Sequence, residues 1–169
     1  RNLLPVKPFV FPFGSDARGQ WWQFDGLNTQ WTPQPSPLPH QGPWNLHLSG
    51  KIRQWYGGGT GIYLALSAEN YTHISLNVLG SGPLPGYVVK IELIDDDNQD
   101  FKVDLAESGR TKARDDRWAY DLIVDWKGWQ HLNIPLSAFH DDNPGVGDDR
   151  WNPSRWMGSG GLLQLQLVA

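Results

Sequence analysis

The sequence predicts an all-β protein, an antiparallel two-sheet β-sandwich of the jelly-roll type. Eight segments alternate apolar and polar side chains with the period of two that is typical of a strand with one buried face. No segment of ten or more residues carries a helical apolar stripe, and the only helical candidate is a turn near Pro135–Phe139. Nineteen glycines and thirteen prolines provide many turns. We therefore expect one domain over residues 1–169, with less than about 10% helix.

The first quarter of the chain contains little that predicts strands. Arg1–Gly14 is apolar and interrupted by proline, so it cannot form a helix, and we expect it to lie extended across a sheet edge. Asp16–Trp31 reads as an aromatic-rich loop. Thr32–Pro43 carries five prolines and is expected to be irregular. The first predicted strand begins at Trp44.

From there strands follow one another, separated by Gly, Pro, Asn and Asp. The last one shows the pattern clearly, because Leu163, Leu165 and Leu167 face one way while Gln164 and Gln166 face the other. The eight predicted strands are Trp44–Ile52, Gly61–Ser67, Tyr71–Leu79, Tyr87–Asp95, Phe101–Glu107, Arg117–Trp126, Trp129–Phe139 and Gly160–Ala169.

Ten tryptophans are the outlier in the composition. Trp118, Trp126 and Trp129 lie among apolar residues in two adjoining predicted strands, so core packing is their favoured role. Trp44 heads an alternating strand and is also predicted to be core. The residues that we expect to be buried between the sheets are Trp118, Trp129, Leu132, Ile134, Leu163 and Leu165.

Charge, hydropathy and cysteine content exclude several classes of partner and structural feature. The net charge is −4 and there is no run of Lys or Arg, so a nucleic-acid partner is not expected. No apolar stretch reaches about 18 residues, so we expect no membrane-spanning helix. The absence of cysteine excludes disulfides and cysteine-ligated zinc. The chain starts at Arg1 without Met or a visible signal peptide, which we interpret as a processed chain or an excised domain.

No motif of a known catalytic type is present. The five histidines form no zinc-binding pattern, and neither a nucleophile elbow nor a phosphate-binding loop occurs. Adjacent carboxylates at Asp115–Asp116, Asp141–Asp142 and Asp148–Asp149 are interpreted as solvated turn residues, not as a catalytic pair. Asp95–Asp100 has the clustered oxygens that calcium requires, but a hairpin between two strands is the favoured interpretation.

Several aromatic residues lie in predicted loops among Gly, Gln, Asp, Arg and Asn. One reason for a loop aromatic to be exposed is sugar binding, in which the C–H face of a pyranose stacks on a flat ring while polar neighbours bind its hydroxyls. The alternative is a tryptophan that anchors a loop at the end of the sandwich. Sequence alone leaves both open for Trp21, Trp22, Trp55, Tyr56 and Trp151.

The stretch from Trp118 to Phe139 also carries a family resemblance. Trp118-x-Tyr120, then Trp129, then Ile134-Pro135-Leu136-Ser137-x-Phe139 resembles a signature of the galactose-binding-like jelly rolls. The chain looks most like the family 11 carbohydrate-binding modules, and more distantly like the domain of complex I assembly factors. The resemblance extends over about Gly86–Val168.

This resemblance implies a non-catalytic module that binds a β-linked polysaccharide, of glucan or galactan type, in a groove of aromatic and polar side chains. It also implies attachment to a glycoside hydrolase, a secreted, periplasmic or cell-surface location, and a monomer within a larger multidomain chain. Structural calcium in that family is bound by acidic residues near both termini. This chain reaches Ala169 without an acidic closing residue, so the resemblance leaves a bound calcium ion possible but does not require it. A structural or protein-interaction β-sandwich is the alternative function, and an enzyme ranks third. The expected sugar-binding residues are Trp55, Tyr56, Arg53, Trp22, Asp116, Arg117, Asp142, Trp151, Gln164 and Gln166.

Overall fold

The fold is an antiparallel β-sandwich, seen in a computed structural model that describes residues 19–33, 44–51, 57–83, 88–105, 114–155 and 159–169. One sheet has six strands in the order β1-β4-β10-β6-β7-β9, and two further ladders pair β2 with β3 and β5 with β8. The strands are β1 (Trp22–Asp25), β2 (Leu27–Pro33), β3 (Trp44–Gly50), β4 (Gly58–Leu66), β5 (His73–Ser81), β6 (Val88–Asp95), β7 (Asp116–Ile123), β8 (Lys127–Pro135), β9 (His140–Asp141) and β10 (Leu162–Val168).

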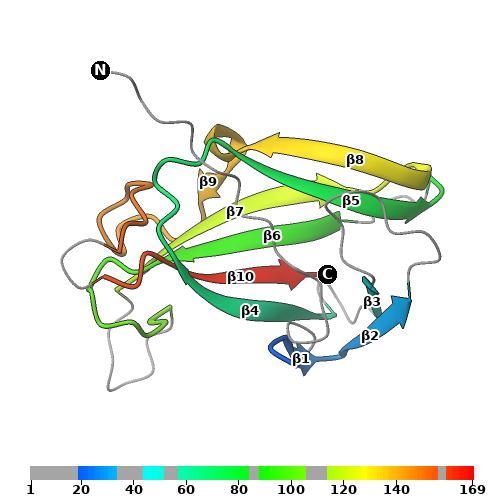
Figure 1. Ribbon diagram of the computed structural model, residues 1–169, viewed down its shortest axis with the longest axis horizontal. Coiled ribbons are helices and arrows are strands. Elements are labelled where there is room, and N and C mark those ends of the chain that lie inside the picture. The colour runs from blue at the N-terminus through cyan, green and yellow to red at the C-terminus, as the bar shows by residue number, and fades with distance from the viewer. Residues whose placement is uncertain (1–18, 34–43, 52–56, 84–87, 106–113, 156–158) are drawn as a thin grey trace.

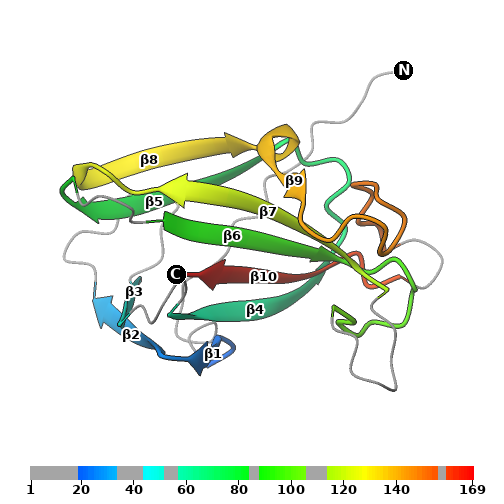
Figure 2. The same cartoon turned by 180° about the vertical axis from the view of Figure 1, so that it is seen from behind.

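The hydrophobic core lies between the six-stranded sheet and the β5–β8 ladder, which covers one of its faces (Figures 1 and 2). Ile91 and Leu93 of β6 are 1% exposed, and Ile134 of β8 packs against the same cluster. Ile91 and Leu93 lie two positions apart in β6, because alternate side chains of a strand point to one face. Each strand therefore presents its other face away from this core.

The predicted fold class is confirmed. Every strand pair is antiparallel, and the only helical element among the described residues is the 3-10 turn η1 (Leu136–Ala138), where the sequence placed its one helical candidate. No helix in the described part of the chain has the length and hydropathy to cross a membrane.

Two segments differ from the sequence prediction. The stretch predicted as an aromatic-rich loop contains β1 and most of β2, because its backbone pairs with β4 and β3. The segment predicted as a strand from Phe101 has no strand over the described residues 101–105. Asp95–Asp100 is consequently not a hairpin turn: β6 pairs with β7, and the long connection between them begins there.

The core prediction is confirmed for Ile134 and Leu163, holds in part for three residues and is wrong for Trp129. Ile134 and Leu163 are buried, while Trp118, Leu132 and Leu165 are partly buried and pack against the core. Trp129 is 55% exposed. It lies three positions from Leu132, and an odd spacing in a strand puts the two side chains on opposite faces. Trp129 pairs with Leu79 of β5, which is 57% exposed on the same outer face.

Candidate functional site

The outer face of the six-stranded sheet carries polar and aromatic residues from strands spread across its width. Strand pairing aligns one position from each strand, so that residues far apart in the sequence lie side by side. From one edge to the other, the row is Trp22, Gly61, Gln166, Glu92, Ala119 and His140. We call this surface the polar face and define it as Trp22, Phe24, Tyr63, Lys90, Glu92, Arg117, His140, Asp142, Gln164 and Gln166.

Two aromatic rings of β1 lie over glycines of β4 at one edge of the polar face. A Cβ atom at Gly61 would stand 2.7 Å from Cζ2 of Trp22, and one at Gly59 would overlap the ring of Phe24. Only glycine allows rings to come this close to the backbone of a neighbouring strand. Trp22 and Phe24 are both half-buried, so part of each ring stays accessible.

Charged groups gather at the other side of the polar face. Asp142 lies beside three basic side chains, with its oxygens 2.9 Å from Nε of Arg117, 3.4 Å from Nζ of Lys90 and 3.7 Å from Nε2 of His140. The Arg117 contact is an ion pair without hydrogen-bond geometry at Nε, whereas Nη2 of Arg117 donates to the Asp142 carbonyl at 3.5 Å. Glu92 stands 4.0 Å from the same Nε.

Glu92 is the most enclosed carboxylate of this group, at 8% exposure. Burial raises the pKa of Glu92, and Asp142 adds to the rise, while Arg117 and Lys90 oppose it. The guanidinium of Arg117 therefore lies between two carboxylates, one of them desolvated, and its remaining N–H groups are available for other acceptors.

Neutral hydrogen-bonding groups occupy the centre of the polar face. Gln166 donates from Nε2 to Oε1 of Gln164 at 2.8 Å, so the two amides form one half-buried pair on β10. Tyr63 is 44% exposed beside them, and its hydroxyl donates to the carbonyl of Phe101 at 3.1 Å. The pair retains one amide N–H₂ and one amide oxygen for further hydrogen bonds.

The structure brings together half of the predicted sugar-binding residues. Trp22, Arg117, Asp142, Gln164 and Gln166 all lie on the polar face. Five members of the polar face were not among the predicted sugar-binding residues: Phe24, Tyr63, Lys90, Glu92 and His140. The alternation in Gly61–Ser67 and Tyr87–Asp95 nevertheless placed Tyr63, Lys90 and Glu92 opposite the core residues.

The other predicted residues do not join this face. Asp116 is 0% exposed and shares the inner side of β7 with Trp118. Trp151 packs edge-to-face on Trp118 with ring centroids 6.1 Å apart, so it anchors a loop against the core. Trp21 likewise contacts Trp31 at 6.3 Å. The remaining three predictions, Arg53, Trp55 and Tyr56, lie outside the described residues.

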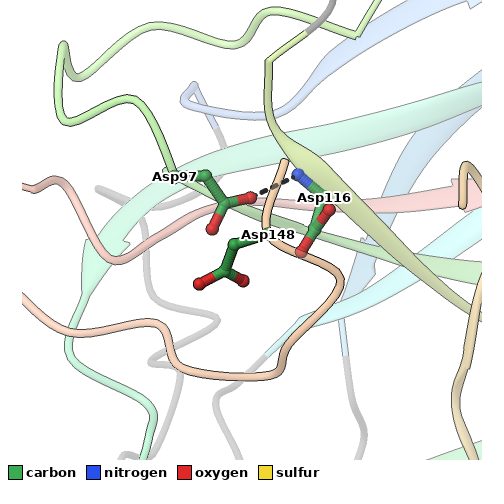
Figure 3. Close-up of side chains that lie close together, drawn as sticks. All are labelled: Asp97, Asp116 and Asp148. Atoms are coloured by element: carbon green, nitrogen blue, oxygen red, sulfur yellow. Dashed lines mark hydrogen bonds between the residues drawn. The ribbon is translucent and has the colours of Figure 1, made fainter. Parts of the chain in front are cut away.

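A second cluster of functional groups lies at the end of the sandwich where β6 ends and β7 begins. Asp97, Asp116 and Asp148 each offer a carboxylate oxygen, and these oxygens lie within 4.8 Å of one another (Figure 3). We call these three residues the aspartate triad. The carboxylate of Asp97 also accepts a hydrogen bond from the backbone N–H of Asp116 at 2.8 Å, shown as the dashed line.

Burial and mutual repulsion perturb the carboxyl groups around the triad. Burial, with added repulsion from Asp97, raises the pKa of Asp95 to about 8. Burial likewise raises the pKa of Asp97 to about 7, and the pKa values of Asp115 and Asp116 to about 6. None of the ion pairs within the described ranges includes a member of this acidic group. The interpretation of Asp115–Asp116 as solvated turn residues is therefore wrong, because both are 0% exposed.

Comparison with known proteins supports the fold. No protein-family model matches the chain, and no curated protein matches it in sequence. Among solved structures, it is similar to the family 11 carbohydrate-binding module of the cellulosomal cellulase Lic26A-Cel5E of Clostridium thermocellum, with 13% identity and a TM-score of 0.54 over 88% of this chain and 77% of that one. It is also similar to the family 11 module from Clostridium thermocellum in complex with a β-1,3-1,4-mixed-linked tetrasaccharide, with 14% identity and a TM-score of 0.55 over 88% of this chain and 78% of that one. At this identity the likeness shows a shared jelly-roll fold.

Proposed function

We propose that the chain is a non-catalytic carbohydrate-binding module that holds a polysaccharide on the polar face. The observation that carries the proposal is the alignment of aromatic, amide and charged side chains in rows across six strands. A row of this kind suits an extended polymer, because successive sugar units meet successive strands about 4.8 Å apart.

The chemistry of the polar face suits a neutral sugar. The rings of Trp22 and Phe24 offer apolar surface for the C–H face of a pyranose at one edge. Gln164 and Gln166 offer both donors and acceptors, which hydroxyl groups need. Arg117 and Asp142 form a charged pair that adds donors and acceptors with little net charge.

We further propose a β-linked polysaccharide of the glucan or galactan type as the ligand. One similar solved structure is a complex with a β-1,3-1,4-mixed-linked tetrasaccharide, and this chain shares its fold over 88% of its length. We also propose that the module is attached to a glycoside hydrolase in a larger chain, acts as a monomer, and works outside the cytoplasm, at the cell surface or in the periplasm. Arg53, Trp55 and Tyr56 stay proposed as sugar-binding residues, with the two rings as stacking groups.

Affinity electrophoresis against soluble glucans, galactans and xylans tests the proposal. Retardation of the parent chain by a β-glucan or β-galactan, and its loss in Trp22→Ala, is the expected result. Trp129→Ala is the matched control, since Trp129 is an exposed tryptophan on the other sheet. Retardation that disappears in Trp129→Ala but persists in Trp22→Ala would show that the sugar binds the outer face of the β5–β8 ladder instead. Trp55→Ala and Tyr56→Ala extend the same series.

A reducing-sugar assay on the same polysaccharides separates binding from catalysis. We expect no release of reducing ends, because the polar-face carboxylates Glu92 and Asp142 are both engaged with Arg117. Steady release by the parent chain, abolished in Glu92→Gln, would show a glycoside hydrolase instead.

A further inference from the structure

We propose that the aspartate triad is a calcium site that ties the start of β7 to the two loops beside it. The site is separate from the calcium position near the chain ends that the family resemblance implies, since its ligands come from the middle and later part of the chain. Three segments meet in it: the start of the connection after β6 at Asp97, the first residue of β7 at Asp116, and the loop after β9 at Asp148.

Asp116 provides the observation that distinguishes this site from an ordinary acidic surface. Its side chain is 0% exposed, and while Oδ2 accepts from the backbone N–H of Arg150 at 3.2 Å, Oδ1 has no hydrogen-bond partner. A buried carboxylate oxygen without a partner is strongly disfavoured, and an ionised one far more so. A cation bound by Asp97 and Asp148 at the same point would provide the missing partner.

Gly147 shapes the other wall of the site. It has a φ of +72°, and a Cβ atom there would overlap Oδ1 of Asp116 and Oδ2 of Asp97. The loop after β9 therefore places the backbone of a glycine beside the two carboxylates. The space next to them, which a side chain at this position would fill, stays open. A surface pocket lined by Asp97, Gly147 and Asp148 opens onto this position and gives an ion access from solvent.

The negative charge of the surrounding carboxylates also favours a bound cation. Asp95, Asp96 and Asp115 are buried close to the triad, at 1%, 3% and 0% exposure. Arg114 lines the same pocket, but none of the ion pairs among the described residues joins it to the triad.

The ligand atoms favour calcium over other metals. All three are carboxylate oxygens, which hard cations prefer, and the triad contains no histidine, which zinc and copper favour. Oxygens up to 4.8 Å apart can share an ion at a bond length of about 2.4 Å, which is the calcium range. Magnesium binds at about 2.0–2.1 Å and requires a tighter, regular octahedron.

Calorimetric titration of the chelator-stripped chain with calcium chloride tests the site, together with the unfolding temperature measured in EDTA and in calcium. We expect saturable binding of one ion and a rise of about 5–10 °C when calcium exceeds its Kd about a hundredfold. The same titration with magnesium chloride should give a smaller rise.

Variants distinguish a metal site from a merely structural cluster. Asp97→Asn and Asp148→Asn should each weaken calcium binding at least about tenfold. Asp116→Asn should raise the unfolding temperature in EDTA, because it removes a buried charge, and should abolish the response to calcium. Asp125→Asn is the matched control, since Asp125 is an exposed aspartate outside the triad, and it should behave like the parent.

Three outcomes would overturn the proposal: a parent chain that shows no binding and no thermal shift at about 10 mM calcium, triad variants that respond like Asp125→Asn, or a magnesium response as large as that to calcium. None of these outcomes depends on sugar binding, so the calcium site and the proposed carbohydrate-binding function are tested independently.

Discussion

Arg117 and Asp142 form an ion pair on the charged side of the polar face, with Nε and Oδ2 2.9 Å apart. Their backbones are also joined, because the N–H of Asp142 donates to the carbonyl of Arg117 at 2.8 Å. The N–H of Arg117 in turn donates to Oδ1 of Asn143 at 2.7 Å. The loop after β9 is therefore held against β7 at the point where the two charges meet.

Replacing Arg117 tests whether this pair binds sugar. Arg117→Leu leaves Asp142 and the desolvated Glu92 without their shared cation. We expect at least about a tenfold loss of polysaccharide affinity and about 1 kcal/mol of unfolding free energy. Calorimetry and denaturant unfolding measure the two effects. Arg117→Lys, which keeps the charge but not the planar fork, should recover stability more fully than affinity. Unchanged affinity in Arg117→Leu would remove Arg117 from the site.

Salt should have little effect on binding. The polar face pairs its main charges internally, and a neutral polysaccharide neutralises none of them. We expect the Kd to change less than about threefold between low salt and about 0.5 M sodium chloride. Affinity electrophoresis or calorimetry at several salt concentrations measures this. A steep dependence would indicate an acidic ligand that engages Arg117 and Lys90 directly.

Glu92 should make stability depend on pH in a defined direction. Its pKa is raised in the folded state above the ordinary value of 4.5, so the folded chain binds this proton more tightly than the unfolded chain. The contribution to stability is therefore fully present below about pH 4.5 and is lost as the pH rises through the folded-state pKa. Glu92→Gln should be more stable than the parent at about pH 7 to 8, because the variant carries no charge that burial penalises.

Denaturant unfolding of parent and Glu92→Gln across this pH range measures the difference. Taking the difference between the two chains cancels the titration of the acidic cluster, which both retain. The advantage of the variant should disappear below about pH 4.5. An advantage that instead grows toward acid pH would show that ionised Glu92 stabilises the fold through Arg117.

Gly61 should be required for the aromatic edge of the polar face. In Gly61→Ala the new Cβ would stand 2.7 Å from the Trp22 ring and 2.9 Å from the carbonyl oxygen of Leu165. We expect a cost of about 1–3 kcal/mol and a loss of sugar retardation similar to that of Trp22→Ala. Gly19→Ala is the control, since nothing lies within 4 Å of that position. Normal binding by Gly61→Ala would show that the Trp22 ring is free to move or is not used.

The sequence predicts both Trp118 and Trp129 to be core residues, but their replacement should have different effects on stability. Trp118 packs against the core and Trp151, so Trp118→Ala should cost about 3–5 kcal/mol. Trp129 is 55% exposed, and Trp129→Ala should change stability by less than about 1 kcal/mol. Denaturant unfolding compares them. A cost below about 1 kcal/mol for Trp118→Ala would show that its ring is not part of the core.

Strand alternation predicted most of the fold and several members of the polar face. Gln164 and Gln166 lie opposite the leucines of β10, as their spacing indicates, and Ile134 is buried. The same rule places Asp116 and Arg117 on opposite faces of β7, and Trp129 and Leu132 on opposite faces of β8, since each pair has an odd spacing within one strand. Because Arg117 is on the polar face, alternation alone is enough to exclude Asp116 from it.

The aspartate triad could not be assembled from the sequence, because its members are 19 and 32 residues apart along the chain and meet only through tertiary structure. The pairing of β6 with β7 brings Asp97 near Asp116, and the loop after β9 adds Asp148. A local pattern showed only turn-like acidic stretches. The aromatic stretch at β1 was equally ambiguous, since its pairing partner on β4 consists largely of glycine and carries little strand signal.

The strands at the two edges of the six-stranded sheet, β1 and β9, are only four and two residues long. Short edges leave few unpaired backbone groups onto which a second chain could add a strand, a common route to aggregation. Within the described part of this sheet, the long strands β4, β10, β6 and β7 are each flanked on both sides by a neighbour. If copies of the chain crowd along one polymer, their six-stranded sheets would therefore meet through side chains and offer little backbone for joining into fibrils.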